Sequence, residues 1–489
     1  MHISLINLPR HEVHRPPLSL ALLSEMCNQA NVDYECYDFS LEIFQQLTSN
    51  YNAIDNWCIT GIIEDYELEQ IQDWANTRIV DILNKTPDTV FALSLLSVWS
   101  IPIAELMCKT IRALCNNQIV LGGQGLADQD WVYQQHQQKL FDFYFVNEVE
   151  ITWPAFLRGR YDLPGINNYD FEQIDDLNQH CVIPDYRNLL SKYQYPYLED
   201  IPELFITASR GCVRRCGYCD IGHQWKKYRY RDATHVAQEM ITQYERHGVT
   251  HFFFTDSLIN GSMKMLNQLC DCLIDYNQTN PGSKFNFKGQ YIFRPKDQVK
   301  EQQIARMKQA GLDYVIVGLE TGSDRVRHDM DKKHTNDDAE YFFEMFKRYG
   351  IKCHLLMITG WVTETIEDHQ QTLAMFRRWQ KYVASGTITG IELGSTLTVL
   401  EHSPIGVRTT ELGITFLGDK PYLWESSKNP DLTITERVRR RIETHREAMK
   451  YYWPITRSLY RLNTIKQHYV EACELTKKHQ RTIPIRPIS

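Results

Sequence analysis

The stretch Arg210-Gly211-Cys212-Val213-Arg214-Arg215-Cys216-Gly217-Tyr218-Cys219 places three cysteines within eight residues, at the spacing C-x3-C-x2-C. Three thiols this close cannot all lie on one strand face or one helix stripe, so the stretch predicts a loop. Thiolates are ligands for soft metal centres. A structural zinc site uses four ligands, usually in two separated pairs, but here only His223 follows nearby. The spacing therefore favours a [4Fe–4S] cluster on three thiolates, which leaves one iron open to a small molecule.

With the aromatic Tyr218 before its third cysteine, this stretch resembles the signature of the radical S-adenosylmethionine (SAM) enzymes. The resemblance implies that Cys212, Cys216 and Cys219 hold the cluster, and that its open iron binds the amino and carboxylate groups of SAM. It also implies reductive cleavage of SAM to a 5′-deoxyadenosyl radical that abstracts hydrogen from a substrate. The electron would come from a donor such as flavodoxin or ferredoxin. A zinc loop remains the alternative at this point.

The composition is that of an ordinary globular chain. The 489 residues are 43% hydrophobic and 23% charged, and this length suggests about three domains at ~150 residues each. No apolar run reaches the ~18 residues that a membrane span needs, and the first residues lack the pattern of a signal peptide. A net charge of −8 argues against a surface that coats nucleic acid. The odd count of thirteen cysteines fits free thiols in a reducing compartment, so a cytoplasmic protein is expected.

Residues 1–160 alternate buried strands with amphipathic helices. This alternation predicts a doubly wound parallel sheet, with ligands bound beyond the carboxyl ends of the strands. The expected strands are 3–8, 32–38, 89–96, 118–121 and 141–146, with helices at 18–29, 101–115 and from about 150.

Four short motifs in this region resemble the cobalamin (B12)-binding-type domain that precedes many radical SAM cores. They are Pro16-Pro17-Leu18-Ser19-Leu20-Ala21-Leu22-Leu23, Tyr37-Asp38, Val120-Leu121-Gly122-Gly123 and Asn147-Glu148-Val149-Glu150. The last motif usually reads Gly-Glu-Gly-Glu, and a branched side chain at Val149 keeps backbone away from a ligand. Trp99 occupies the loop where a corrin ring would lie, while His11 and His14 follow the first strand. We therefore expect cobalamin to bind weakly or not at all.

Residues 161–203 contain several prolines between polar residues and predict an extended linker. Within it, 193–197 is tyrosine-rich and is expected to pack against both flanking domains rather than to line a site. From residue 204 to about 400 the strand–helix alternation resumes. Six such units predict a partial (βα)6 barrel of the TIM type, with the site at the carboxyl ends of the strands. The expected strands are 204–208, 251–255, 285–293, 314–319, 352–358 and 387–393.

The expected strand ends carry polar residues and glycines that match the radical SAM pattern. By that resemblance Asp256 and Ser257 lie near the SAM amine, and Arg294 is positioned to pair with the SAM carboxylate, because a guanidinium matches a carboxylate. The resemblance extends to the fourth-strand motif and the fifth-strand turn. It places Gly318, Glu320 and Ser323 near the ribose or methionine part of SAM, and Gly360 near adenine, although Trp361-Val362 replaces the usual Leu-Pro.

Two charged segments flank this core. Trp225-Lys226-Lys227-Tyr228-Arg229-Tyr230-Arg231 follows the cysteines, and an ordinary cluster-covering segment is favoured over a site for nucleic acid or another anion. Residues 401–489 predict a helical C-terminal region. Its helix at about 433–452 carries Arg437, Arg439, Arg440 and Arg441, and such a charge run is typical of a solvated face.

The sequence therefore predicts a radical SAM enzyme with domains at 1–160 and 204–400, a linker at 161–203 and a helical region at 401–489. The leading function is hydrogen abstraction from an unknown substrate, with methyl transfer if cobalamin binds. A cobalamin-free rearrangement, epimerisation or oxidation is the second enzymatic hypothesis. A non-catalytic metal or iron–sulfur binding module is the third hypothesis.

Overall fold

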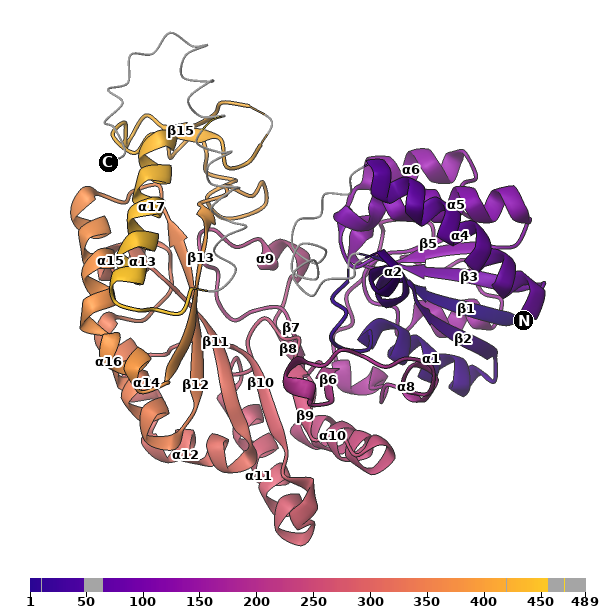
Figure 1. The fold of residues 1–489 in the computed structure, drawn as a ribbon, viewed down its shortest axis with the longest axis horizontal. Coiled ribbons are helices and arrows are strands. Elements are labelled where there is room, and N and C mark those ends of the chain that lie inside the picture. Colours follow the sequence, from indigo (N-terminus) through magenta and orange to yellow (C-terminus); the bar gives the residue numbers. More distant parts are fainter. Residues whose placement is uncertain (10, 48–64, 419, 456–469, 471–489) are drawn as a thin grey trace. The chain divides into compact units, whose positions relative to one another are not determined.

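The computed structural model describes residues 1–9, 11–47, 65–418, 420–455 and 470. The chain folds as two compact units (Figure 1). The first comprises Met1–Ile206 with Gln238–His251, and the second comprises Thr207–Ala237 with the described residues from Phe252 onward. The part of the predicted C-terminal region beyond residue 455 lies outside the described residues, apart from residue 470.

The first unit is built on a five-stranded sheet in the order β2-β1-β3-β4-β5. All four strand pairs are parallel, as the alternation of strands and helices predicted. The order reverses between β1 and β3, and such a reversal marks the place where doubly wound sheets bind ligands. The elements up to the second unit are β1 (His2–Asn7), α1 (Leu18–Ala30), β2 (Asp33–Asp38), α2 (Phe39–Leu47), α4 (Asp65–Lys85), β3 (Thr89–Ser94), η1 (Val98–Ser100), α5 (Ile101–Leu114), β4 (Ile119–Gly122), η2 (Gln124–Ala127), α6 (Gln129–Gln137), β5 (Phe143–Phe145), α7 (Thr152–Leu157), η3 (Leu177–His180), α8 (Arg187–Lys192), η4 (Leu198–Asp200) and β6 (Glu203–Ile206).

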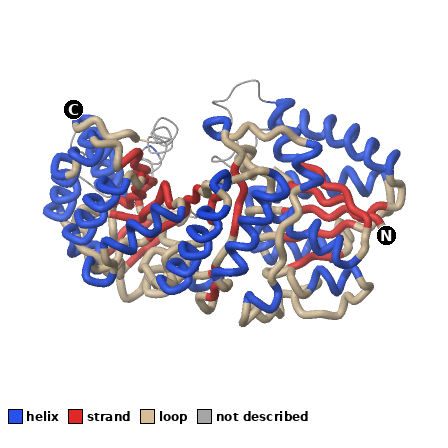
Figure 2. Tube along the Cα trace, turned by 90° about the horizontal axis from the view of Figure 1, so that it is seen from below, coloured by secondary structure: helices blue, strands red, loops and turns tan. Residues whose placement is uncertain are grey.

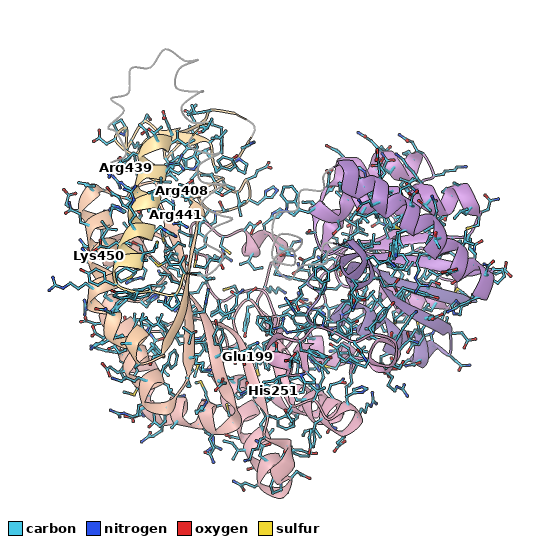
Figure 3. The ribbon with its side chains drawn as sticks, in the orientation of Figure 1. Glu199, His251, Arg408, Arg439, Arg441 and Lys450 are labelled. Carbon is cyan, nitrogen blue, oxygen red and sulfur yellow. The ribbon has the colours of Figure 1, made fainter. Side chains whose placement is uncertain are left out.

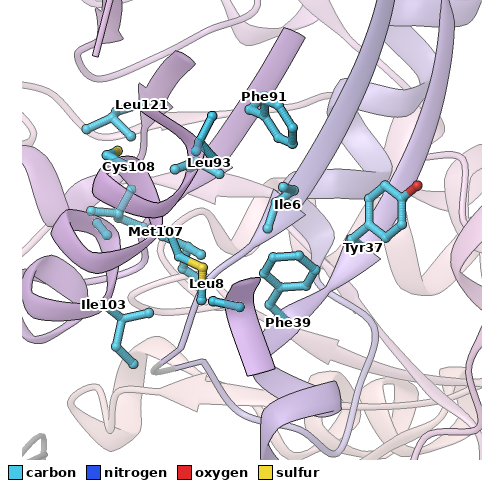
Figure 4. Close-up of a cluster of buried hydrophobic side chains, with 14 of the residues drawn as sticks. Ile6, Leu8, Tyr37, Phe39, Phe91, Leu93, Ile103, Met107, Cys108 and Leu121 are labelled. Atoms are coloured by element: carbon cyan, nitrogen blue, oxygen red, sulfur yellow. The ribbon is translucent and has the colours of Figure 1, made fainter. Parts of the chain in front are cut away.

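Helices cover both faces of this first sheet (Figure 2). One layer of its core joins buried side chains of β1, β2, β3 and β4 to those of α5 (Figure 4). Residues 161–203 are mostly irregular but include the short α8. Within them, Tyr195 is buried and its hydroxyl donates to Asp38 Oδ2 at 3.1 Å. Tyr195 therefore packs into the core of the first unit, which is one half of the packing expected for the tyrosine-rich piece.

The second sheet has six strands in the order β13-β12-β11-β10-β9-β6. The pairs from β10 to β13 are parallel. Each strand from β9 to β12 is followed by a helix, and α12, α14 and α16 lie along one side of the strands in Figure 1. The remaining elements are β7 (Ser209–Arg210), α9 (Ile221–Gln224), β8 (Arg229–Tyr230), α10 (Ala233–His247), β9 (His251–Phe254), α11 (Met263–Thr279), η5 (Pro281–Ser283), β10 (Asn286–Tyr291), η6 (Lys296–Gln298), α12 (Glu301–Ala310), β11 (Leu312–Glu320), α13 (Asp324–Asp329), α14 (Asn336–Tyr349), β12 (Lys352–Thr359), α15 (Ile366–Arg378), α16 (Gln380–Ala384), β13 (Ile388–Thr396), β14 (Ile414–Phe416), β15 (Trp424–Ser426) and α17 (Ile434–Lys450).

The carboxyl ends of the central strands are irregular. The pairing of β11 with β12 shifts register between Gly318 and Glu320, and that of β12 with β13 shifts between Met357 and Thr359. Such irregularities redirect side chains at a strand end, and they are common beside functional sites. Here they fall in two of the segments that the sequence associated with SAM.

The C-terminal region corrects one prediction. The arginine run of α17, part of which is labelled in Figure 3, does not form a solvated face. Arg437, Arg440 and Arg441 are buried, and only Arg439 is partly exposed. Arg437 donates to the carbonyls of Tyr422 at 3.3 Å and Trp424, and Arg441 donates to those of Leu393 and of Gly394, the latter at 2.7 Å. The run is buried because these guanidinium groups satisfy carbonyl oxygens that come from other parts of the chain. The region also contains the antiparallel pair β14–β15, which the predicted helical region did not include.

Candidate active site

The cysteine loop leaves the short strand β7 and is tied to its surroundings through its backbone. Gly211 has φ = +86°, and a Cβ there would lie 2.7 Å from the carbonyl oxygen of Lys227. Further along, the Gly217 N–H donates to the carbonyl of Met330 at 3.0 Å. The carbonyl of Gly217 accepts from the Ile405 N–H at 2.9 Å. Two separate segments therefore bond the backbone of the loop, and a third lies too close to Gly211 to leave room for a side chain.

The three cysteines are free thiols. Burial raises the pKa of Cys212 to about 11, and each of the other two thiolates would raise it further. Burial also raises the pKa values of Cys216 and Cys219. Backbone N–H groups of Arg214 and Ile221 favour the thiolates of Cys212 and Cys219. The other two thiols are near enough to affect the pKa of Cys212, and metal binding at the loop would displace the protons of all three.

Directly beside this loop lies a buried triad of Tyr218, Glu320 and Lys332. The Tyr218 hydroxyl donates to Glu320 Oε1 at 2.6 Å, and the Lys332 ammonium donates to the same oxygen at 2.9 Å and to the Tyr218 hydroxyl at 3.0 Å. Glu320 has φ = +68° at the end of β11. A Cβ on Gly318 would lie 2.2 Å from Glu320 Oε1 and 2.8 Å from Lys332 Nζ. Gly318 is therefore required by the triad itself, whatever ligand lies nearby.

Asp256 anchors the segment that leads into the loop. Its Oδ2 accepts from the Ala208 N–H at 3.0 Å, and its Oδ1 accepts from the Ser209 hydroxyl at 2.5 Å. Complete burial raises the pKa of Asp256 to about 6. Ser257, the next residue, is partly exposed. Of this predicted pair, Asp256 has a clear structural role at the strand end, and the proximity of both residues to the SAM amine stays a prediction.

Three cationic or polar side chains near the loop have unused hydrogen-bonding atoms. Arg294 donates to the carbonyls of Asn260 and Gly261 at 2.8 and 2.9 Å. Burial and the nearby Arg214 guanidinium lower its pKa. Among the described residues, Nε of Arg294, Nε of Arg214 and Nε2 of the buried His334 lack partners. Buried donors of this kind are usually satisfied by a partner, and guanidinium groups match carboxylates and other anions.

Ser323 and Gly360 are committed to packing within the protein. The Ser323 hydroxyl donates to Asp368 at 2.6 Å and accepts from an N–H in the first turn of α13, where Ser323 is the N-cap. Gly360 has φ = +81°, and a Cβ there would lie 2.6 Å from Cγ of Arg437. Both predicted SAM contacts therefore have a structural explanation as well, and their contact with SAM is still a prediction.

The structure thus gathers Tyr218, Glu320, Arg294 and the three cysteines around one loop. Sequence reasoning missed Lys332 and Arg214 as members of this site. Lys332-Lys333 reads as a surface pair after a short helix, and only the spatial proximity of Tyr218 and Glu320 gives Lys332 a function. Arg214 lies inside the cysteine motif at a position whose residue type the motif leaves open. Its place between two cysteines was the one available signal.

The donors around the loop fit a [4Fe–4S] cluster. A cluster on three thiolates is anionic, and the loop offers N–H donors, the guanidinium of Arg214 and the ammonium of Lys332 around it. His223 instead stacks on His402, with ring centroids 3.8 Å apart. Within the described residues, no three His, Cys, Asp or Glu side chains are gathered so as to hold a single metal ion. Nor does that part of the chain contain a helix long and apolar enough to cross a bilayer.

In the first unit, the predicted cobalamin cleft shows mixed features. Asn147 has φ = +67°, so it adopts the conformation of the glycine it replaces, and its buried Oδ1 lacks a partner among the described residues. Gly123 is required by its own loop, because a Cβ there would lie 2.2 Å from the Leu95 carbonyl. Trp99 is 59% exposed in the loop after β3. His11 and His14 each bond a backbone carbonyl, of Glu12 and Pro196, at 2.8 Å.

Comparison with known proteins identifies the second unit. Residues 206–376 match the Radical SAM superfamily. The chain is 25% identical over 213 residues to the anaerobic magnesium-protoporphyrin IX monomethyl ester cyclase of Rubrivivax gelatinosus, which covers 43% of this chain and 37% of the cyclase. It is 23% identical over 175 residues to the cytidylyl-2-hydroxyethylphosphonate methyltransferase of Streptomyces wedmorensis. This aligned region covers 35% of this chain and 31% of that enzyme. The chain thus spans less than half the length of these curated relatives.

Solved structures extend the likeness across both units. The radical SAM methyltransferase TsrM from Kitasatospora setae, with cobalamin and a [4Fe–4S] cluster bound, has a TM-score of 0.60 at 16% identity, with 87% of this chain and 82% of TsrM covered. The cobalamin-dependent radical SAM enzyme OxsB has a TM-score of 0.60 at 15% identity, with 84% of this chain and 60% of OxsB covered. Residues 206–376 are therefore a radical SAM domain, and most of the chain shares the fold of two cobalamin-dependent radical SAM enzymes.

Proposed function

We propose that this protein binds one [4Fe–4S] cluster through Cys212, Cys216 and Cys219 and uses SAM to start a radical reaction on an organic substrate. A cluster held by these three thiolates would supply the electron for reductive cleavage of SAM, and so the radical that abstracts hydrogen from the substrate. The single observation that carries the proposal is the convergence of three thiols with cationic donors on one fixed loop.

The protein's own residues have distinct tasks in this proposal. Arg294 and Arg214 hold a carboxylate, since their buried Nε groups lack partners among the described residues and a guanidinium matches a carboxylate. Asp256 fixes the segment entering the loop through Ala208 and Ser209. In this proposal the SAM carboxylate fills the arginine site.

A low-potential one-electron donor, such as flavodoxin or ferredoxin, supplies the electron. The reducing environment that keeps such a cluster and the free thiols intact supports a cytoplasmic location. The substrate is a separate matter, because the described site names no group that is specific to one compound.

The cluster is tested by anaerobic reconstitution of the full chain. We expect about four irons and four sulfides per chain, and loss of most of them in Cys216→Ala. The matched control is Cys272→Ala, which removes a partly exposed thiol from α11. Stoichiometric zinc without sulfide, or equal iron loss in the control, would refute the cluster and favour a non-catalytic metal-binding module.

SAM chemistry is tested on the same loaded protein. Reduction in the presence of SAM should yield 5′-deoxyadenosine. Arg294→Met should weaken SAM binding about tenfold or more, because a charge-assisted hydrogen bond is lost, while iron content stays unchanged. Arg306→Met is the control, since Arg306 pairs with Asp271 on an exposed surface. Normal SAM affinity in Arg294→Met would remove Arg294 from the site.

Methyl transfer is the second candidate, and the likeness to TsrM and OxsB favours it. It requires cobalamin in the first unit. Cobalt and a corrin spectrum in protein from cobalamin-fed cells would support it. Without cobalt, a rearrangement, epimerisation or oxidation remains.

A further inference from the structure

Lys332 is buried, which is unusual for a lysine, and strained backbone on both sides holds it there. Its side chain is 8% exposed, whereas the side chain of Lys333 beside it is 52% exposed. Asp331 and Lys333, on either side of it, have φ = +62° and φ = +59°. Left-handed backbone is costly for residues other than glycine, and such strain persists only where the surroundings enforce it. Both flanking residues are thus strained in the turn that directs Lys332 inward.

The ion pair that Lys332 forms does not by itself account for this cost. A buried lysine–glutamate pair must overcome the desolvation of both charges, and apolar residues of similar volume often serve stability equally well. Glu320 is itself held at φ = +68° to meet the ammonium. Three strained residues therefore maintain a charged pair that the fold does not need for packing. The simpler physical reason for the strain is that a positive charge is needed at this position.

The ammonium faces the cysteine loop through its closest contacts. Nζ lies 3.0 Å from the hydroxyl of Tyr218 and 5.7 Å from the centroid of its ring. The turn that carries Lys332 is joined to the loop by the bond from the Gly217 N–H to the Met330 carbonyl. Tyr218, which the ammonium contacts, lies between Cys216 and Cys219 in the loop, so the charge of Lys332 is next to the cluster ligands.

We propose that Lys332 is a positioning residue that sets the reduction potential of the cluster. Its positive charge raises the potential, and the negative charge of Glu320 partly offsets this effect. This inference rests on the proposed function, since it needs the cluster. The cluster gains one negative charge when a flavodoxin- or ferredoxin-type donor passes it an electron. A fixed positive charge favours that reduced state and raises the potential. Because the side chain of Lys332 is buried, solvent and salt screen this effect less than at an exposed lysine.

The test is an EPR-monitored redox titration of the reconstituted full chain. Lys332→Met should make reduction by a fixed donor about tenfold less favourable, as two unit charges about 10 Å apart interact by roughly this much at an effective dielectric constant of ~20. For a one-electron couple this is a downward shift of about 59 mV. Glu320→Gln should shift the potential upward by a smaller amount. The double variant Lys332→Met with Glu320→Gln should lie between the two.

Lys333→Met is the matched control. It removes an adjacent lysine charge that is exposed and paired with Asp331, so its potential should stay near that of the wild type. Equal shifts in Lys332→Met and Lys333→Met would overturn the inference, as would shifts of the same sign in Lys332→Met and Glu320→Gln. Loss of the cluster from both Lys332→Met and the double variant would also overturn it, by showing that Lys332 is a scaffold. If the wild type itself holds no cluster, that result refutes the proposed function, and with it the basis of this inference.

Discussion

The indole ring of Trp361 lies against Gly217, the residue between Cys216 and Tyr218. A Cβ on Gly217 would stand 2.6 Å from Cη2 and 3.1 Å from Cζ2 of Trp361. The ring cannot easily give way, because its Nε1–H donates to Asp329 at 2.7 Å and its side chain is buried. The fifth-strand turn, where Trp361-Val362 replaces the usual Leu-Pro, thus packs directly against the cysteine loop.

Gly217→Ala should therefore disturb the cysteines. Overpacking of this kind costs ~1–3 kcal/mol, and we expect a lower melting temperature together with reduced iron content after reconstitution. Adding Trp361→Leu to Gly217→Ala should restore part of the iron. Gly222→Ala is the control, because a Cβ there meets nothing within 4 Å. Full iron loading in Gly217→Ala would show that the loop adapts to the ring.

Gly360 offers a second steric test. Its added Cβ would meet Arg437, and its φ of +81° is also strained for alanine. Gly350→Ala isolates the second effect, since Gly350 has φ = +67° and open space around it. Left-handed strain alone costs roughly 1–2 kcal/mol. Gly360→Ala should lower the free energy of unfolding clearly more than Gly350→Ala in denaturant titrations. Equal losses would mean that Arg437 moves aside without cost.

Stability should also fall in mild acid because of His369. Burial lowers the pKa of His369 to about 4, below its ordinary value of 6.5, against the opposing effect of the Glu443 carboxylate 3.1 Å away. In this pH range His369 binds a proton in the unfolded chain but stays neutral in the folded chain. The free energy of unfolding therefore decreases as the pH falls from about 6.5 to about 4. The decrease due to this residue is about 1–3 kcal/mol. His369→Gln should flatten the pH dependence measured by chemical denaturation, and the exposed His328→Gln should not. A parallel profile for His369→Gln would exclude His369 as the source.

For cobalamin, the two substituted glycine positions should behave differently. Asn147 already adopts left-handed backbone at φ = +67°, whereas Val149 is not among the residues with positive φ. Val149→Gly should then raise corrin affinity about tenfold to a hundredfold, which corresponds to relief of ~1–3 kcal/mol of crowding. Asn147→Gly should change it less. Cobalt content and the corrin spectrum measure both variants, and one tightly held corrin per wild-type chain would contradict the expectation of weak binding.

The sheets were predictable because their strands are local apolar patterns. β1, β3 and β12 begin and end within two residues of the predicted strands, since each is a short buried run followed by a break in the pattern. The helices predicted at 18–29 and 101–115 match α1 and α5 to within one residue. The extra pair β14–β15 was missed because each strand is only three residues long.

The site was less predictable, because the residues that contact one another there lie far apart in the sequence. The C-x3-C-x2-C spacing is visible in the sequence, but the partners of Glu320 are 102 residues before it and 12 after it. Its positive φ leaves no trace in residue type. The arginines of α17 were misread for the same reason. Their acceptors, such as the carbonyls of Leu393 and Trp424, come from other elements and cannot be inferred from a run of charges.

Those buried arginines limit how far this protein can be treated as a set of exchangeable modules. Arg437, Arg440 and Arg441 donate to the carbonyls of Trp424, Glu364 and Leu393, so a segment that looks appended in sequence completes the hydrogen bonding of two strands and of the loop after β12. A chimera that replaced α17 with a helix from a different protein would leave these carbonyls without donors unless that helix carried arginines at the same three positions. Grafts are therefore better made at boundaries that keep α17 with its own β12 and β13.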